Sequence, residues 1–354
     1  MNINSGFWKK IKEQAVAEQR PIMVLAPMAN VTDAAFRRII AKYGKPDVTW
    51  TEFVSADGLC SPAGKPALLR DLVYGETERP IIAQLFSSHP DKMREAAALV
   101  AELGFDGIDI NMGCPDKSIE KQGAGAAHIK DPARAKEVIA AAMEGARAGM
   151  LKNAENKKNA KKLDANTQPV NTQPIPISVK TRIGYSKNEL ETWLPELLST
   201  GIAALTIHCR TRKEMSKVPA RWEHVKRAVE IRDSLKVSTL ILGNGDALDW
   251  ADGEAKAHAT GADGIMFGRA IFGNPWLFNK VRPDISILER LRVMVEHTEA
   301  FEELLGGFKN FAIMKKHYKA YVHGWDGAKE LRMRLMAAET AKDVKTIVSE
   351  YVAK

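Results

Sequence analysis

Short apolar runs alternate with amphipathic stretches from residue 22 to about residue 280. The runs have the length and β-branched content of buried strands, at Ile22–Ala26, Val48–Phe53, Ile81–Phe86, Gly107–Asn111, Ile177–Thr181, Ala204–His208, Thr239–Gly243 and Gly264–Gly268. Between them lie amphipathic stretches that predict helices, at Asp33–Tyr43, Pro90–Leu103, Asp131–Ala148, Leu190–Thr200, Trp222–Ser234 and Asp249–Thr260. Strand–helix alternation predicts an α/β fold of parallel βαβ units. Eight such units favour a closed (β/α)8 TIM barrel over an open sheet.

The alternation stops near Ser286, and helical periodicity continues alone to the end of the chain. It predicts helices at Leu288–Leu304, Phe308–His323, Ala328–Ala337 and Ala341–Ala353. We therefore expect two domains, a barrel over residues 1–284 and a small C-terminal helical domain over residues 285–354. A short polar helix is also expected at Phe7–Arg20.

Residues 150–174 are rich in Lys, Asn, Gln and Thr and separate the fourth predicted barrel helix from the fifth strand. This composition indicates a lysine-rich insertion, which we expect to be a mobile loop at the amino-terminal face of the barrel. A solvated loop without a role is the simpler interpretation.

The composition restricts the kind of protein further. A net charge of +8 favours polyanionic partners. The three cysteines include no CxxC pair, which indicates a reducing compartment and argues against a cysteine-rich metal site. No apolar run approaches the roughly 20 residues of a membrane helix. We expect a cytoplasmic monomer that binds neither a metal ion nor a membrane.

The segment Gly104–Ile129 carries the most unusual combination of residues. A buried strand breaks at Gly113, which permits a close approach of the backbone to a ligand, and Pro115 cannot continue the strand. Between them stands the thiol of Cys114. We interpret it as a group held for chemistry, whereas a small buried apolar cysteine is the alternative.

Polar residues follow nearly every predicted strand at its carboxyl end, where TIM barrels carry their active sites. The residues at these carboxyl ends are Pro27, Met28 and Ala29 after the first strand, Gln84 on the third, Asn111 and Cys114 on the fourth, Lys180 and Arg182 on the fifth, His208 and Arg210 on the sixth, Asn244, Gly245 and Asp246 on the seventh, and Gly268 and Arg269 on the eighth.

The last two strands predict a phosphate site. Gly268 offers an open backbone N–H and Arg269 a forked cation, and Asn244-Gly245-Asp246 follows the neighbouring strand. A structural turn explains Gly268-Arg269 alone about as well, but the two segments together predict a phosphorylated ligand.

The other strand ends favour redox chemistry. Lys180 lies among core-like residues and suits a reduced flavin ring, although a strand lysine is often a surface residue. The amides of Gln84 and Asn111 suit the edge of a pyrimidine-like ring. His208 could serve either ligand or be structural. No hydrolase or Walker motif is present, so a thiol that supplies a proton in a redox step fits best.

In sequence order, the chain resembles the tRNA-dihydrouridine synthase family, in its bacterial, FMN-dependent branch. The resemblance spans about Pro21 to Phe278 and rests on APMANVTDAAFRRI, TEFVSADGL, QLFSSHPD, GIDINMGCP, GAGAAHI, VKTRIG, HCRTR, GNGD and DGIMFGRAIFGNPWLF, with a weaker match in KKHYKAYVHGWDGAKELR. The chain departs from the family at Cys209, where the family usually has Gly, and in the insertion at 150–174.

The resemblance implies an FMN-containing barrel with a helical tRNA-binding domain. FMN would be held by Pro27, Met28, Ala29, Gln84, Asn111, Lys180, His208, Asn244, Gly245, Asp246, Gly268 and Arg269. NADPH would reduce FMN, hydride would pass to C6 of an extruded uridine, and Cys114 would protonate C5. We assign tRNA contacts to Arg182, Arg210, Arg212, Lys315, Lys316 and Lys319.

Two alternatives remain open at this point. A flavin barrel could act on free pyrimidines or other small molecules, but it would need neither the helical domain nor a basic face. An RNA-binding module could have kept the barrel and lost turnover, against which the intact Cys114 argues.

Overall fold

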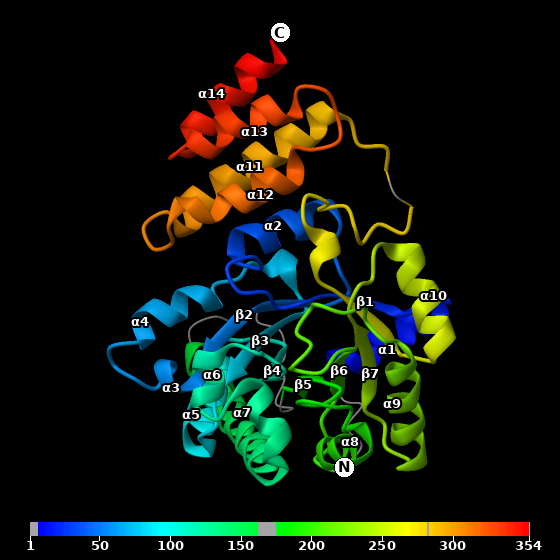
Figure 1. Ribbon diagram of the computed structural model, residues 1–354. Helices are drawn as coiled ribbons and strands as arrows, with labels where there is room; N and C mark the ends of the chain where they lie inside the picture. Colours follow the sequence, from blue (N-terminus) through cyan, green and yellow to red (C-terminus); the bar gives the residue numbers. More distant parts are fainter. Residues whose placement is uncertain (1–5, 162–174, 282, 354) are drawn as a thin grey trace.

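Eight parallel strands form the centre of the molecule in a computed structural model that describes residues 6–161, 175–281 and 283–353 (Figure 1). The strands are β1 (Ile22–Leu25), β2 (Thr49–Ser55), β3 (Ile81–Phe86), β4 (Gly107–Met112), β5 (Ile177–Arg182), β6 (Ala204–His208), β7 (Leu240–Asn244) and β8 (Gly264–Phe267). Their order around the sheet is β1-β8-β7-β6-β5-β4-β3-β2. A parallel bridge between Val24 and Val48 joins the two outer strands. The predicted TIM barrel is confirmed.

Helices surround the barrel as the alternation predicts. They are α2 (Ala34–Tyr43), α3 (Ala56–Leu59), α4 (Lys65–Leu68), α5 (Pro90–Glu102), α6 (Lys117–Lys121), α7 (Pro132–Lys161), α8 (Leu190–Leu198), α9 (Glu223–Ser234) and α10 (Trp250–Thr260). The strands are buried on both faces, which is why each one reads as a continuous apolar run. Among the described residues, no helix is long and apolar enough to cross a bilayer.

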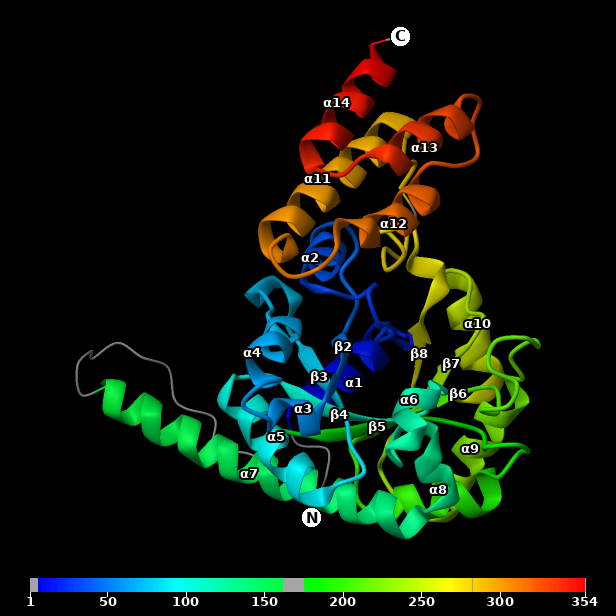
Figure 2. The same ribbon diagram turned by 60° about the vertical axis from the view of Figure 1, so that its left-hand side comes forward.

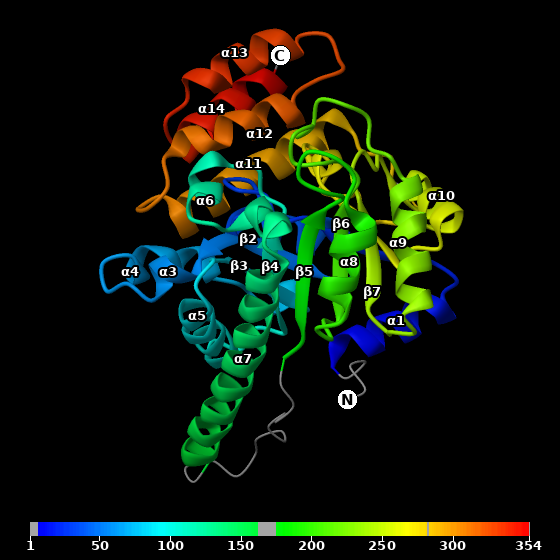
Figure 3. The same ribbon diagram turned by 60° about the horizontal axis from the view of Figure 1, so that its bottom comes forward.

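One end of the barrel is closed by α1 (Phe7–Ala17), which lies on the side opposite the C-terminal helices (Figure 3). Trp8 of α1 packs toward Trp50 of β2, with ring centroids 6.1 Å apart. Both indole rings are buried in the apolar cluster inside the barrel. The predicted polar helix therefore has an apolar side that covers the barrel interior, and the opposite end is left for a ligand.

The helix α7 continues to Lys161 and projects beyond the barrel (Figure 2). The prediction of a loop is wrong for residues 150–161, and residues 162–174 lie outside the described residues. The physical reason is composition, because this stretch holds helix formers and neither Gly nor Pro. Contact with α5 also supports the helix: Gly149 fits so closely that an added Cβ would lie 2.1 Å from the Ala98 carbonyl oxygen, and Lys152 pairs with Glu102 at 2.9 Å.

Four helices form the C-terminal part of the chain, α11 (Ile287–Leu305), α12 (Met314–Tyr321), α13 (Ala328–Ala337) and α14 (Ala341–Val352). The prediction of one helix over residues 308–323 is wrong at its amino end. Asn310 caps a separate 3-10 turn, Phe311–Ile313, by accepting from the backbone N–H of Ala312 at 2.8 Å. The core of these helices also includes Ala35 and Ile39 of α2, so they pack directly on the barrel domain.

Candidate active site

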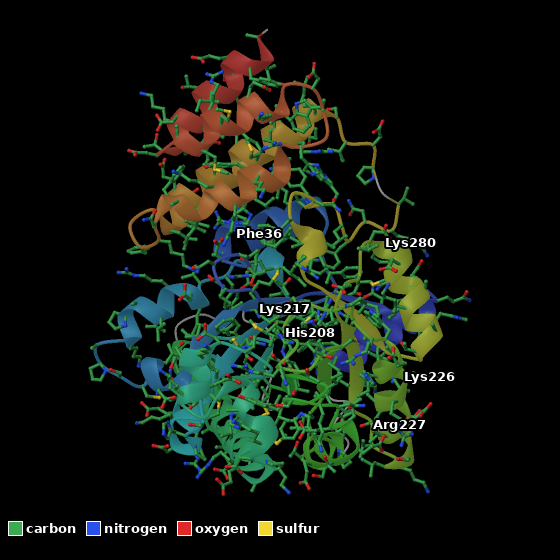
Figure 4. The ribbon with its side chains drawn as sticks, viewed as in Figure 1. Phe36, His208, Lys217, Lys226, Arg227 and Lys280 are labelled. Atoms are coloured by element: carbon green, nitrogen blue, oxygen red, sulfur yellow. The ribbon has the colours of Figure 1, made fainter. Side chains whose placement is uncertain are left out.

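A cavity of about 600 Å³ opens at the carboxyl ends of the strands. It is lined by most of the residues predicted to bind a cofactor, namely Pro27, Met28, Lys180, His208, Asn244, Gly245, Asp246, Gly268 and Arg269, and also by Arg210. Figure 4 shows His208 near the centre of the molecule, whereas Lys226, Arg227 and Lys280 lie toward its edge. Ala29, Gln84 and Asn111 do not line this cavity; Ala29 is exposed, and the two amides are buried in the barrel.

The loops after β7 and β8 build the polar side of the cavity. An added Cβ on Gly268 would meet only the Met28 sulfur, at 3.9 Å, so this backbone faces open space. Gly245 has a φ of +127°, where an L side chain would be strained. The amide of Asn244 donates to the Met266 carbonyl at 2.8 Å and ties the two strand ends together. The loop after β8 thus presents open backbone at Gly268, beside the fixed amide of Asn244.

Two arginines share the carboxylate of Asp246. Arg269 donates to one oxygen at 2.5 Å, and Arg210 donates to the other. Burial raises the pKa of Asp246, but the hydrogen bond from Ala220 and the two guanidinium groups outweigh it and hold the pKa below its usual value. Two cations around one anion leave a net positive charge at the edge of the cavity, as a phosphate site requires.

Lys180 and His208 face the middle of the cavity. Burial, with Arg182 nearby, lowers the pKa of Lys180 to about 8, so the ammonium group remains largely charged at neutral pH. Burial and the surrounding cations lower the pKa of His208 well below its usual value, so its ring is neutral. Because Arg210 can only donate, its 3.1 Å contact makes Nε2 of His208 the acceptor and leaves the proton on Nδ1.

The Cys114 loop is held from several directions. Asn111 Oδ1 accepts from the backbone N–H groups of Gly113 at 3.1 Å and Cys114 at 2.9 Å. Arg182 donates to the Gly113 carbonyl at 2.7 Å, and the N–H of Ala126 donates to the Cys114 carbonyl at 3.0 Å. Gly113 lies close to β5, since an added Cβ would lie 3.2 Å from the backbone of Thr181. The close approach found there is to a neighbouring strand, whereas the sequence predicts one to a ligand.

The thiol of Cys114 is half-buried. Burial raises its pKa above the usual value, although Lys180 and Arg182 act in the opposite direction. The thiol is consequently protonated at neutral pH, and it can donate a proton.

The arginines assigned to tRNA lie deeper than expected. Arg182 is 5% exposed and donates to three backbone carbonyls, and Arg210 is 2% exposed within the cavity. Arg212 pairs with Glu120 of α6 and lies over the ring of Tyr185. All three hold the loops of the barrel mouth, and the burial of Arg182 and Arg210 does not suit contacts with an RNA surface.

The three lysines of α12 differ from one another. Lys319 is exposed, Lys315 is half-buried, and Lys316 donates to the carbonyl of Asn30 in the barrel domain. Lys309, just before α12, pairs with Glu52 and with Asp71 at 3.0 Å. Part of the basic character of this region therefore joins the C-terminal helices to the barrel.

Sequence reasoning missed Asp109, a fully buried carboxylate on β4 beside Gln84 and Ser178. The available signal was an acidic residue inside an apolar strand, two positions before Asn111. Cys209 proves sterically undemanding: it is buried and is not among the described residues with positive φ, so a side chain fits there without strain. Among the described residues, no group of acidic, His or Cys side chains could hold a metal ion.

The fold and the site define a TIM-barrel protein with a cavity edged by two arginines and with a thiol at the barrel mouth. This chain belongs to the dihydrouridine synthase family, whose model matches residues 24–147 and 157–354. The family resemblance found in the sequence is thereby confirmed.

Curated relatives match over nearly the full length. The chain is 35% identical to the probable tRNA-dihydrouridine synthase 2 of Bacillus subtilis (strain 168), over 99% of this chain and 98% of that protein. It is 34% identical to the probable tRNA-dihydrouridine synthase of Staphylococcus aureus (strain MRSA252), over 99% and 97%.

Solved structures with a similar fold are more distant. Morphinone reductase in complex with tetrahydroNAD has a TM-score of 0.45 and 12% identity, over 72% of this chain and 85% of that one. DHODH in complex with ferulenol from Eimeria tenella has a TM-score of 0.49 and 14% identity, over 82% and 83%.

Proposed function

We propose that this protein is a tRNA-dihydrouridine synthase that uses FMN and NADPH to reduce the C5–C6 double bond of uridines in tRNA. The proposal is carried by one juxtaposition: the anion-binding cavity and the protonated Cys114 thiol lie at the same barrel mouth, in a chain of the dihydrouridine synthase family.

The cavity fits an FMN molecule by its own chemistry. The open backbone at Gly268 and the arginine pair around Asp246 would hold the phosphate, beside Gly245 in the cavity wall. Lys180 and neutral His208 would face the ring system, with Pro27 and Met28 on the first strand. When bound, FMN would supply the hydride that reduces the uracil ring.

Cys114 would act as a general acid. Its raised pKa keeps the proton on Sγ, and the backbone clamp from Asn111 holds the loop in place. The proton leaves Sγ for C5 of the uracil as C6 gains hydride, and the resulting thiolate recovers a proton from solvent. Arg182 stabilises the arrangement by fixing the Gly113 carbonyl.

The C-terminal helices would bind the tRNA, with exposed Lys319 and half-buried Lys315 as phosphate contacts. The target uridine is stacked within a folded RNA, so it must be extruded to reach the barrel mouth. Arg210, which the sequence assigned to RNA, is better placed to serve the phosphate cavity.

The deciding experiment combines cofactor identification with a substrate comparison. The purified protein should be yellow and should release FMN on denaturation. With NADPH it should form dihydrouridine in unmodified tRNA and leave free uracil and uridine untouched. A colourless protein that FMN does not restore would overturn the proposal, and reduction of free pyrimidines alone would favour the small-molecule alternative.

The tRNA surface has its own test, the Lys315→Gln/Lys319→Gln variant. Losing two phosphate contacts should weaken tRNA binding and flatten its salt dependence, by about 0.9 in the logarithmic slope per duplex contact. The control, Lys226→Gln/Lys236→Gln, removes the same charge from exposed positions in and beyond α9. Equal binding by the two variants would contradict the assignment.

A further inference from the structure

A chain of hydrogen bonds runs beneath the barrel mouth, from a buried carboxylate to the Cys114 loop. Asp109 Oδ2 accepts from Gln84 Nε2 at 2.6 Å, and Gln84 Oε1 accepts from Asn111 Nδ2 at 3.2 Å. Asn111 Oδ1 then accepts from the backbone N–H groups of Gly113 and Cys114. Ser178 completes the far end by donating to Asp109 Oδ1 at 2.6 Å.

The strand register explains how these residues meet. Asp109 is the direct partner of Gln84 across β3 and β4, and of Ser178 across β4 and β5. Asn111 lies two residues further along β4, so it faces the same side of the sheet as Asp109. The hydrogen bonds therefore connect one layer of side chains inside the barrel to the next layer, nearer the mouth.

Both ends determine the direction of this chain. The backbone N–H groups of Gly113 and Cys114 can only donate, so Asn111 must turn Oδ1 toward them and Nδ2 toward Gln84. Gln84 must then accept through Oε1, which leaves its Nε2 facing Asp109. A carboxylate is an acceptor, and it matches that donor. Each amide has one orientation that satisfies all of its neighbours.

We propose that Asp109 is a positioning residue for Cys114, acting through the amides of Gln84 and Asn111. The role rests on the proposed function in that Cys114 is the acid. Asp109 does not touch the thiol, and it sets the orientation of the amide that clamps the thiol's own backbone N–H. A carboxylate that served only the packing of the barrel would need partners, but no particular direction in the bonds between Gln84 and Asn111.

The direction of the chain can be reversed by exchanging two residues. In Asn111→Asp, position 111 still accepts from the loop, but Gln84 now lies between two carboxylates and can donate to only one. In Asp109→Asn/Asn111→Asp, Gln84 turns over, donates to residue 111 and accepts from residue 109, and Ser178 still has an acceptor. The double variant satisfies every group with the opposite polarity.

Two readouts separate this role from the proposed function. The first is the alkylation rate of Cys114 by iodoacetamide in the purified protein, resolved from Cys60 and Cys209 by mass spectrometry. The second is single-turnover reoxidation of the reduced enzyme by unmodified tRNA. Asn111→Asp should change both, with reoxidation slowed about 10- to 100-fold, as for a reacting group misplaced by about 1 Å. The double variant should return both to near the wild-type values.

A double variant that behaves like Asn111→Asp alone would overturn the proposal. So would Asp109→Leu, which removes the acceptor, if its Cys114 alkylation and reoxidation rates equalled those of the wild type. The control is Asp106→Asn, because Asp106 bonds Arg79 and the N–H of Ile81 near the amino-terminal end of the strands and should leave both readouts unchanged. If tRNA does not reoxidise even the wild type, the alkylation rates still test the positioning role, and only the proposed function fails.

Discussion

Two buried polar clusters in this protein treat their polar atoms in opposite ways. Inside the barrel, Asp109, Gln84 and Asn111 pass hydrogen bonds from one to the next. Between the barrel and the C-terminal helices, His297 of α11 and His317 of α12 are fully buried, and neither ring nitrogen of either residue has a hydrogen-bond partner in the described structure.

The histidines serve as aromatic surfaces. Their ring centroids lie 4.8 Å apart, and Phe36 of α2 lies 5.4 Å from His297 and 5.2 Å from His317. Burial lowers the pKa of His297 to about 3 and that of His317 well below its usual value, so both rings are neutral. The junction of α2 with the C-terminal helices thus packs like an apolar core.

Burial acts on Asp109 with the opposite sign, raising its pKa to about 6. Hydrogen bonds from Gln84 and Ser178 and the nearby charge of Lys180 limit that rise. The comparison shows two ways of treating the cost of burying polar atoms. Hydrogen bonds offset this desolvation cost where they position a reacting group, and the cost remains where the side chains only fill space.

The largest effect is expected at the group that the barrel cluster positions. Cys114→Ala should leave the protein folded and yellow, and flavin reduction by NADPH should proceed at close to the normal rate. Reoxidation by tRNA should slow by about 10²–10⁴-fold, the range for a lost general acid. Single-turnover reoxidation measures this step.

Cys60→Ala and Cys209→Ala are the matched controls, because they remove a thiol away from the proposed reaction. Both should reoxidise at nearly the wild-type rate. If the variant at position 114 also reoxidised at the wild-type rate, the proton would come from another group. Asp109, Gln84 and Asn111 would then not position the proton donor.

The second prediction concerns acid stability at the domain junction. The unfolded chain protonates histidine below about pH 6.5, while the folded pKa values are lower, so stability is fully present above pH 6.5 and is lost as the pH falls toward 3. At pH 5 the loss is about 2 kcal/mol for His297 alone. His297→Leu/His317→Leu should remove this loss, as urea unfolding at pH 7 and pH 5 would show.

His258→Gln is the control, because His258 is exposed on α10 and should leave the pH dependence unchanged. If the double leucine variant loses as much stability between pH 7 and pH 5 as the wild type, the two histidines do not cause the loss. Their rings would then be already protonated or would become hydrated in the folded protein.

The third prediction has the opposite sign. The folded pKa of Asp109 is raised above its ordinary value of 3.8, so the folded state keeps a proton between about pH 4 and pH 6 that the unfolded state releases. Because of Asp109, wild-type stability should therefore fall as the pH rises from 4 to 6, by no more than about 2 kcal/mol. The free energy of unfolding of Asp109→Asn should therefore increase relative to that of the wild type as the pH rises from 4 to 6. A difference that stays constant across the window would contradict the pKa shift.

The smallest effect is expected for His297→Leu at pH 7. The variant loses ring contacts worth about 0.5–1.5 kcal/mol, and it also removes two polar atoms that have no partner, each costing about 1–3 kcal/mol. The second term exceeds the first, so the free energy of unfolding should rise, by at least about 0.5 kcal/mol. Phe301→Ala, in the same core, should cost about 3–5 kcal/mol and shows that the assay resolves real packing losses.

The pattern of apolar and polar residues along the sequence was sufficient to predict the architecture. Buried parallel strands read as continuous apolar runs, so all eight were predicted to within a residue or two, and their carboxyl ends located the cavity. It was also sufficient for Cys114 at a strand end, because the break at Gly113 and Pro115 is encoded in adjacent residues.

Partnerships between distant residues depended on the tertiary fold. Arg210 reads as a surface cation after a strand, but Asp246 and His208 draw it into the cavity. Asp109, Gln84 and Ser178 stand far apart in the sequence and meet only because the strand register places them at one level of the barrel. The helix α7 continues beyond its predicted end through its helix-forming composition, and contact with α5 at Lys152 adds support that the sequence does not record. A one-dimensional pattern records which faces are apolar, whereas the partners of a buried polar atom are chosen by packing in three dimensions.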